Sequence, residues 1–326
     1  MKYIYLDQNK WIELAKGLKN KEQKYISLYD TILKNVKDGI WAFPISIIHI
    51  TETMKRKNDA SRKELLDLMF AISNGYAICD YTTADNIEFN HWVNSNSLDC
   101  SQTKDLIIKR DLVSVLGLST ENITIKYSGI AIPSELENIA QIIKNHSCDR
   151  EVFDLICEIT SNESSNGDED YFYECYKKGR DDFRSWKKTI EETEEYKSKH
   201  LYPAYLIRTF FQIYEEKLTS LSKNARKNIV KIFEECSTNK TNTINILETL
   251  PGFNVFNRLV FELYNNPNKQ VHKHDFNDLA YMRVAVPYCD IVIGENYWCD
   301  RVKHYHLDKK YNTIVSTNLM SLIDKG

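Results

Sequence analysis

The stretch Tyr3-Ile-Tyr-Leu-Asp7 decides the fold, because it is a short run of β-favouring apolar residues that ends at a carboxylate. Such a run predicts a buried strand. Residues 10–15 and 25–33 show the spacing of amphipathic helices, and Trp41–Pro44 and Tyr76–Asp80 are two further strand-like runs. Strands that alternate with helices over the first part of the chain predict a parallel sheet.

The middle of the chain differs in character from its two ends. From about residue 96 to 254, helical periodicity dominates and strand-like runs are almost absent. After residue 254 the strand–helix pattern returns, with Ile291–Gly294 as a strand. We therefore expect an α/β protein. Its three-layer α/β/α domain with a parallel sheet is built from residues 1–95 and 255–326, and an all-helical insertion of residues 96–254 interrupts it.

Two local expectations follow from the same patterns. The spacing of apolar residues predicts a helix over residues 104–116. Asp275 is a good N-cap for a helix that runs through Val284, and Pro287 is expected to follow the end of that helix.

Length and composition fit a globular protein of one large or two ordinary domains, with 326 residues, 42% hydrophobic and 27% charged. The formal net charge of −3 argues against coating of nucleic acid through bulk charge, but it allows a local basic rim around an acidic site. The eight cysteines include no C-x-x-C pair, so reduced thiols packed in the core are favoured over a zinc site. No signal peptide and no long apolar run is visible, which predicts a cytoplasmic protein that does not cross a membrane.

Two acids in the first part of the chain are candidates for a site. Asp7 directly follows a strand, and open α/β sheets bind ligands just beyond the carboxyl ends of their strands. The alternative for Asp7 is to cap the helix from Asn9. Glu52 lies on a helix one turn from Ile48 and one turn from Arg56, so it should point partly inward and needs a partner there. That partner is either a metal ion or a basic side chain.

Two residues at the start of this helix have supporting roles. Ser46 can cap the helix, and His49, three residues before Glu52, could orient the Glu52 side chain.

Three acids near the end of the chain complete the set. Asp278 lies in the first turn of a helix, where the helix dipole alone would also favour an acid. Asp275 is more simply the N-cap of that helix. Asp290 opens the strand Ile291–Gly294 and Glu295 closes it. Because they are five residues apart, they point to opposite sides of the pleat, and one of them is expected to be structural.

Clustered carboxylates repel one another unless a cation lies between them. Ligand sets made of oxygen alone suit Mg²⁺ or Mn²⁺. Such an ion stabilises charge on a phosphate and activates a bound water, so the acids point to hydrolysis of a phosphodiester.

These residues resemble those of PIN-domain proteins, a superfamily of metal-dependent ribonucleases related to flap nucleases. The resemblance is carried by Ile4-Tyr-Leu-Asp7, Thr51-Glu52, Asp278 and Ile291-Val-Ile-Gly-Glu295, with Asp290 as a further or substitute acid. It implies that Asp7, Glu52, Asp278 and either Asp290 or Glu295 hold the metal. It also implies an endoribonuclease that cuts single-stranded RNA with a metal-activated water and leaves a 5′-phosphate.

The resemblance covers roughly residues 1–90 and 255–326. It also has implications for the biological role and the partners of the protein. It implies a toxin-like or phage-defence protein, with a protein regulator or antitoxin as partner and pairing into a homodimer. The chain departs from the family in its long insertion and in Gly294-Glu295-Asn296, where Thr-x-Asp is more usual.

Other interpretations stay open. The chain could be a PIN-like module without catalysis that binds RNA or a protein through its insertion, where residues 173–188 mix aromatic with basic side chains. The pairs His272/His274 and His304/His306 could bind metal, although exposed histidines are the default. A metal-dependent phosphatase is a weaker third hypothesis. Asp7 follows a strand, as such an enzyme would require, but Asn9 stands where a second Asp would be expected and counts against it.

Overall fold

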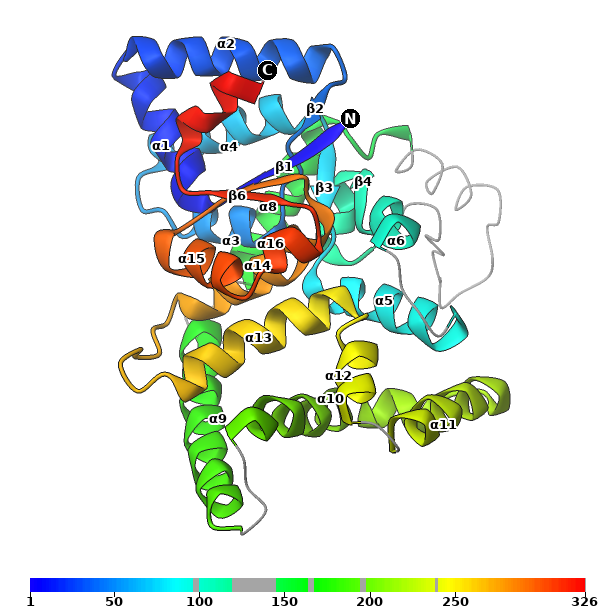
Figure 1. Ribbon diagram of the computed structural model, residues 1–326. Helices are drawn as coiled ribbons and strands as arrows, with labels where there is room; N and C mark the ends of the chain where they lie inside the picture. Colours follow the sequence, from blue (N-terminus) through cyan, green and yellow to red (C-terminus); the bar gives the residue numbers. More distant parts are fainter. Residues whose placement is uncertain (96–99, 119–144, 164–166, 194–197, 238–239, 326) are drawn as a thin grey trace. The chain divides into compact units, whose positions relative to one another are not determined.

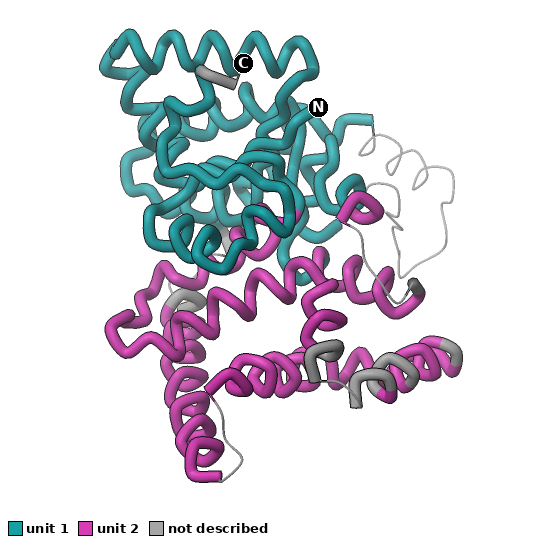
Figure 2. The backbone as a smooth tube through the Cα atoms, in the orientation of Figure 1, with its two compact units in different colours: residues 1–83, 104–165, 288–326 teal, residues 84–103, 166–287 magenta. Residues whose placement is uncertain are grey.

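The computed structural model describes residues 1–95, 100–118, 145–163, 167–193, 198–237 and 240–325. The chain forms two compact units (Figures 1 and 2), each described below by itself. Unit 1 comprises Met1–Thr83, Lys104–Ser165 and Tyr288–Gly326, and unit 2 comprises Ala84–Thr103 and Asn166–Pro287. Residues 119–144, which belong to the stretch expected to be helical, lie outside the described residues.

Unit 1 is built on a parallel sheet of four strands in the order β2–β1–β5–β6. The strands are β1 (Lys2–Leu6), β2 (Trp41–Ala42), β5 (Ile291–Ile293) and β6 (Ile314–Ser316). In the register, Leu6 of β1 stands beside Ile293 of β5, so the carboxyl ends of these two central strands lie level with each other. The two ends of the chain thus meet in one sheet, as the alternating pattern predicted.

Both faces of this sheet are buried, as expected of a parallel sheet with helices on its faces. Ile4 and Leu6 alternate with Tyr3 and Tyr5 along β1. The Ile4 side belongs to an apolar core that helices α1 (Gln8–Lys19), α2 (Gln23–Lys37) and α4 (Asp59–Ser73) help to form. Helix α15 (Asn296–His304) packs against β6, and its Trp298 side chain is buried.

Helix α3 (Ile47–Met54) begins where the sequence predicted, at Ser46. The Ser46 hydroxyl accepts a hydrogen bond from the His49 backbone N–H, and the His49 ring accepts one from the Ser46 N–H. This reciprocal cap satisfies donors that a helix start would otherwise leave unpaired. It also fixes the direction in which α3 leaves the sheet edge.

The expected helix over residues 104–116 is wrong. Helix α6 (Cys100–Ile107) ends early, β4 (Ile108–Arg110) follows, and Leu112–Leu116 form a 3₁₀ helix. β4 pairs antiparallel with β3 (Tyr76–Ile78), and β3 also bonds to Ile45 next to β2. Backbone groups of β3 need partners along the strand, which a helix does not offer.

Helix α8 (Arg150–Glu163) belongs to unit 1, although residues 96–254 were expected to form a separate insertion. Its side chains Phe153, Ile156 and Cys157 join the apolar core that contains β1. Because burial of these three apolar side chains stabilises α8 against that core, the helix folds with unit 1 even though it lies within the expected insertion.

Unit 2 is helical in the part that the structure describes. It contains most of α5 (Tyr81–Ser95) and α14 (Asp275–Tyr288), together with these helices and 3₁₀ turn: α9 (Gly167–Glu191), η3 (Ser198–His200), α10 (Leu201–Ser220), α11 (Lys223–Ser237), α12 (Lys240–Leu247) and α13 (Pro251–Asn265). Glu88 of α5 is fully buried and accepts the backbone N–H of Gly252, at 3.0 and 2.9 Å. Residues 255–287 also belong to unit 2, whereas the sequence predicted them as part of the sheet domain.

Pro287 lies inside α14 rather than beyond its end, contrary to the expectation. In the last turn a proline removes only one intrahelical hydrogen bond. The neighbouring Val286 and Tyr288 are buried, and this burial compensates for the lost bond. No helix within the described ranges is long and apolar enough to cross a bilayer.

Candidate metal centre

Asp7 stands at the junction between β1 and α1, at the carboxyl edge of the sheet. Its backbone N–H donates to the carbonyl of Ile293 at 2.9 Å, which extends the pairing of β1 with β5 by one residue. The Asp7 side chain is only 4% exposed, yet it makes no capping hydrogen bond to α1. Helix capping therefore does not explain this acid.

The carboxylate of Asp7 is poorly compensated. Its Oδ2 atom is buried and has no hydrogen-bond partner among the described residues. Burial, as the largest cause, and the nearby carboxylates of Glu295 and Glu52 together raise the pKa of Asp7 from 3.8 to about 7. The Gln8 backbone N–H and the charge of Lys10 oppose this rise. Three of the predicted acids thus act on one another at this edge.

Glu52 is half-buried on α3, and α3 is tied to the β1–α1 junction on both sides of Asp7. The ring of His49 hydrogen-bonds to the Leu6 carbonyl at 2.8 Å, and the Gln8 side chain donates to the Thr53 hydroxyl at 2.8 Å. These two contacts keep the helix that carries Glu52 close to Asp7.

His49 is a positioning residue that sequence reasoning had considered only as a group to orient Glu52. It is 1% exposed and stacks on Tyr5 with ring centroids 4.8 Å apart. Burial lowers the pKa of His49 to about 3, so the ring is neutral at physiological pH. Its Nδ1 accepts from the Ser46 N–H, so its Nε2 carries the proton and donates to the Leu6 carbonyl. The capping pattern that starts at Ser46 is the sequence signal for this role.

Glu295 reaches the same edge from the neighbouring strand. It follows β5 by two residues, precedes α15 and makes no capping hydrogen bond to that helix. Its side chain is exposed, and its Oε1 accepts a hydrogen bond of 2.6 Å from the Asn9 amide. Asn9 therefore holds an acid of the site, a role that the sequence did not indicate.

The structure does not bring Asp290 to this edge. Asp290 precedes β5, whereas Asp7 and Glu295 follow their strands, so Asp290 lies at the opposite end of the parallel pair. Its Oδ2 accepts the Tyr3 backbone N–H at 2.7 Å, and Lys104 lies 3.3 Å away. Of the two acids that compete for the last place, Glu295 is therefore the one near Asp7, and Asp290 has a structural role.

Asp275 and Asp278 lie on α14 in unit 2 and are described with that unit. Asp275 is buried, with Lys269 at 2.9 Å and the His272 backbone N–H at 2.6 Å. It therefore has a structural role, but as the first residue of α14 with contacts to the preceding loop, rather than as the residue before the helix that the sequence predicted. Asp278 is half-buried in the first turn of the helix.

Among the described residues, no three His, Cys, Asp or Glu side chains are arranged to hold a metal ion as they stand. His272, His274, His304 and His306 are all exposed. At the sheet edge the donor chemistry nevertheless fits a divalent cation, because a buried carboxylate oxygen lacks a partner and two further carboxylates lie near it. Oxygen donors of this kind suit Mg²⁺ or Mn²⁺.

Comparisons of this chain with protein-family models, with curated proteins and with solved structures give no match. Inference about its function therefore rests on the geometry and the chemistry of this edge.

Proposed function

We propose that this chain is a metal-dependent endoribonuclease of the PIN-like type, which hydrolyses single-stranded RNA. One observation carries the proposal: within the described residues the buried Oδ2 of Asp7 has no hydrogen-bond partner, and it lies at the carboxyl edge of a parallel sheet where Glu52 and Glu295 are its electrostatic neighbours. A protein gains no stability from such a group, so a ligand is the more natural reason for it.

Asp7, Glu52 and Glu295 are the residues of unit 1 that would hold the cation. The cation would neutralise these carboxylates, polarise a phosphate oxygen and lower the pKa of a bound water. The protein's own contribution is positional. His49 and Gln8 hold α3 against the end of β1, and Asn9 holds the carboxylate of Glu295.

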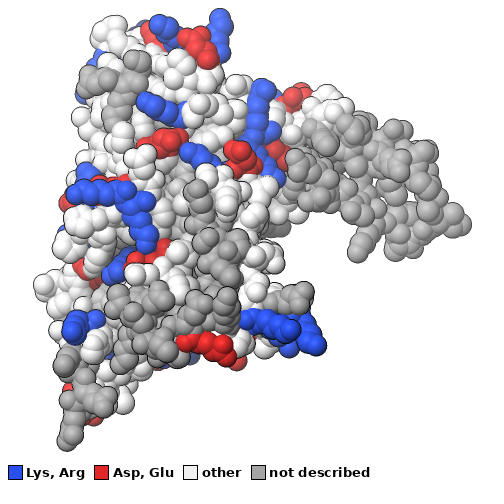
Figure 3. Space-filling model, turned by 45° about the vertical axis from the view of Figure 1, so that its right-hand side comes forward, with Lys and Arg blue, Asp and Glu red and all other residues white. Residues whose placement is uncertain are grey.

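A nucleic-acid substrate is compatible with the charge of the chain if contacts are local. On the face shown in Figure 3, Lys and Arg side chains are interspersed with Asp and Glu rather than gathered in one broad basic surface. At the site, Lys10 lies close enough to lower the pKa of Asp7, and it pairs with Glu13 at 3.0 Å. A phosphate that approached this edge would therefore meet a cationic side chain beside the acids. The choice of RNA over DNA comes from the family resemblance, as do a toxin-like or phage-defence role and a protein regulator.

The test compares wild-type protein with Asp7→Asn and Asp290→Asn, using labelled single-stranded RNA with Mn²⁺. We expect cleavage by wild type and by Asp290→Asn, and none by Asp7→Asn. Asp290→Asn is the matched control, because it removes a carboxylate from the other end of the same strand pair. Equal cleavage by wild type and Asp7→Asn would refute the assignment.

Asp278 belongs to the proposed ligand set through the resemblance alone. The variant Asp278→Asn tests it in the same assay. We expect loss of cleavage with the thermal unfolding midpoint preserved, and retained cleavage would remove this residue from the proposal.

A second candidate is a PIN-like module without catalysis, which binds a partner through unit 2. An exposed apolar groove on α10 and α11 favours it. Absence of both Mn²⁺ binding and cleavage in wild-type protein would select this alternative.

A further inference from the structure

The turn between α10 and α11 in unit 2 carries an open apolar groove of about 530 Å³, which Phe211, Leu218, Leu221 and Val230 help to line. Phe211 is 45% exposed and Val230 is 54% exposed. In the described part of unit 2 the exposed large apolar side chains are these two and Tyr171, so two of the three lie at this groove. Grouped apolar exposure of this kind marks an interaction surface.

The groove is built on a well-anchored turn. Arg226 donates from its Nε to the Leu221 carbonyl at 2.9 Å and from its Nη2 to the Thr219 carbonyl, which satisfies the end of α10. Ala225 and Ile229 are buried on the inner side of α11. These contacts hold α11 in place, so the positions of the side chains on its outer side are fixed.

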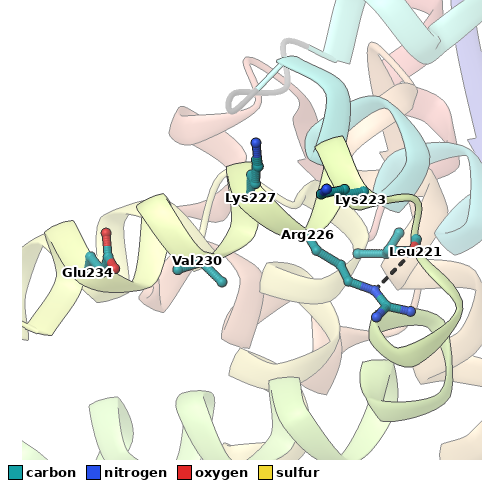
Figure 4. A pocket seen from close by; sticks show the side chains of 6 residues that line it. All are labelled: Leu221, Lys223, Arg226, Lys227, Val230 and Glu234. Carbon is teal, nitrogen blue, oxygen red and sulfur yellow. Dashed lines mark hydrogen bonds between the residues drawn. The ribbon is translucent and has the colours of Figure 1, made fainter.

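Four exposed residues form the outer stripe of α11: Lys223, Lys227, Val230 and Glu234 (Figure 4). Their spacing of four, three and four residues places them along one face of the helix. The stripe is basic towards the helix start and acidic towards its end. This order opposes the helix dipole, which favours acids at the start and bases at the end. The stability of the helix itself therefore does not account for Lys223 and Lys227.

We propose that this groove and the outer stripe bind a second copy of the chain, with the two α11 helices antiparallel about a two-fold axis. In that arrangement the basic end of each stripe faces Glu234 of the other copy, and the two Val230 regions meet near the axis. The surface is self-complementary, as a two-fold interface must be. Because the helix spans only about 22 Å, the interface is at the small end of stable contacts, and the dissociation constant is on the order of micromolar.

The test is the molar mass of the full chain by sedimentation velocity, from about 1 to 200 µM around the expected dissociation constant. Wild-type protein should shift towards twice the 38.3 kDa mass of one chain as concentration rises. Val230→Asp, Lys223→Glu/Lys227→Glu and Glu234→Lys should each weaken the dimer about tenfold or more, because they bury or juxtapose like charges. Lys178→Glu, an exposed lysine on α9, is the matched control and should leave the mass unchanged.

A mixture of the charge-reversal variants tests whether the two α11 helices are antiparallel. In an antiparallel pair, Lys223→Glu/Lys227→Glu presents a wholly acidic stripe and Glu234→Lys a wholly basic one, so an equimolar mixture should form heterodimers although neither variant dimerises well alone. The readout is mass and not cleavage, so it is independent of the nuclease proposal. A wild-type monomer throughout the range would overturn the inference and leave the groove to a different partner. A wild-type dimer that the three variants do not weaken, or failure of the mixture to recover dimer, would overturn it as well.

Discussion

The substitution Asp7→Asn should change how the stability of the protein depends on pH. The ordinary pKa of this carboxyl is 3.8, and in the folded protein burial, Glu295 and Glu52 raise it to about 7. The folded state therefore holds the proton more tightly than the unfolded state. The stability that this proton contributes is fully present below about pH 4 and is lost as the pH rises through about 7.

The size of the effect follows from the two pKa values. A difference of roughly three pKa units corresponds to about 4 kcal/mol of unfolding free energy at pH 8. Asparagine has nearly the same shape and does not titrate, so the variant escapes this loss. Between pH 4.5 and pH 8 in metal-free buffer, the stability of Asp7→Asn relative to wild type should therefore rise by about 3 kcal/mol.

The assay is urea unfolding of both proteins in EDTA at several pH values. At pH 8, added Mn²⁺ should reduce the difference in unfolding free energy between Asp7→Asn and wild type. The cation compensates the ionised Asp7 in wild type and has no such group to bind in the variant. Parallel pH profiles for the two proteins would refute the reasoning, since they would show that Asp7 does not titrate in an unfavourable site.

Three further substitutions test the supports of the site and the extent of unit 1. His49→Phe removes the bonds to Leu6 and Ser46 and should cost about 2–4 kcal/mol in urea unfolding, with little dependence on pH between 5 and 8 because the ring is already neutral. A loss of unfolding free energy that depends on pH between 5 and 8 would contradict a neutral His49 ring. Phe153→Ala should destabilise unit 1 by about 3–5 kcal/mol and increase proteolysis within it, since Phe153 is fully buried in its core, and an effect confined to unit 2 would contradict that placement. Asp290→Asn should cost only about 1 kcal/mol or less, because its amide oxygen can still accept the Tyr3 N–H, and it should leave Mn²⁺ affinity unchanged, whereas a tenfold loss of affinity would make it a ligand.

The parts of the fold that sequence reasoning predicted are those set by local patterns. The runs that end at Asp7 and before Glu295 are strands because each is short, apolar and closed by a polar residue, and their parallel pairing brings the two acids to one edge. Ser46 starts α3 because its hydroxyl satisfies a backbone donor there. Each of these features depends on a few neighbouring residues.

The parts that were missed depend on distant contacts. β4 exists because β3 needs a partner along its backbone, and no local pattern in residues 104–116 reveals that need. The unit boundaries follow from buried contacts such as Phe153 in the unit 1 core and Glu88 at the start of α13. Asp290 and Glu295 looked equivalent in the sequence, and only the pairing with β1 shows which strand end each occupies.

The measurement that tests the central claim most directly is Mn²⁺ binding by isothermal titration calorimetry at pH 7.5. It compares wild type with Asp7→Asn and with Asp290→Asn. We predict one bound ion in wild type and in Asp290→Asn, and no detectable binding in Asp7→Asn. Absence of binding in wild type, or equal affinity in wild type and Asp7→Asn, would contradict the claim that the buried carboxylate of Asp7 is a metal ligand.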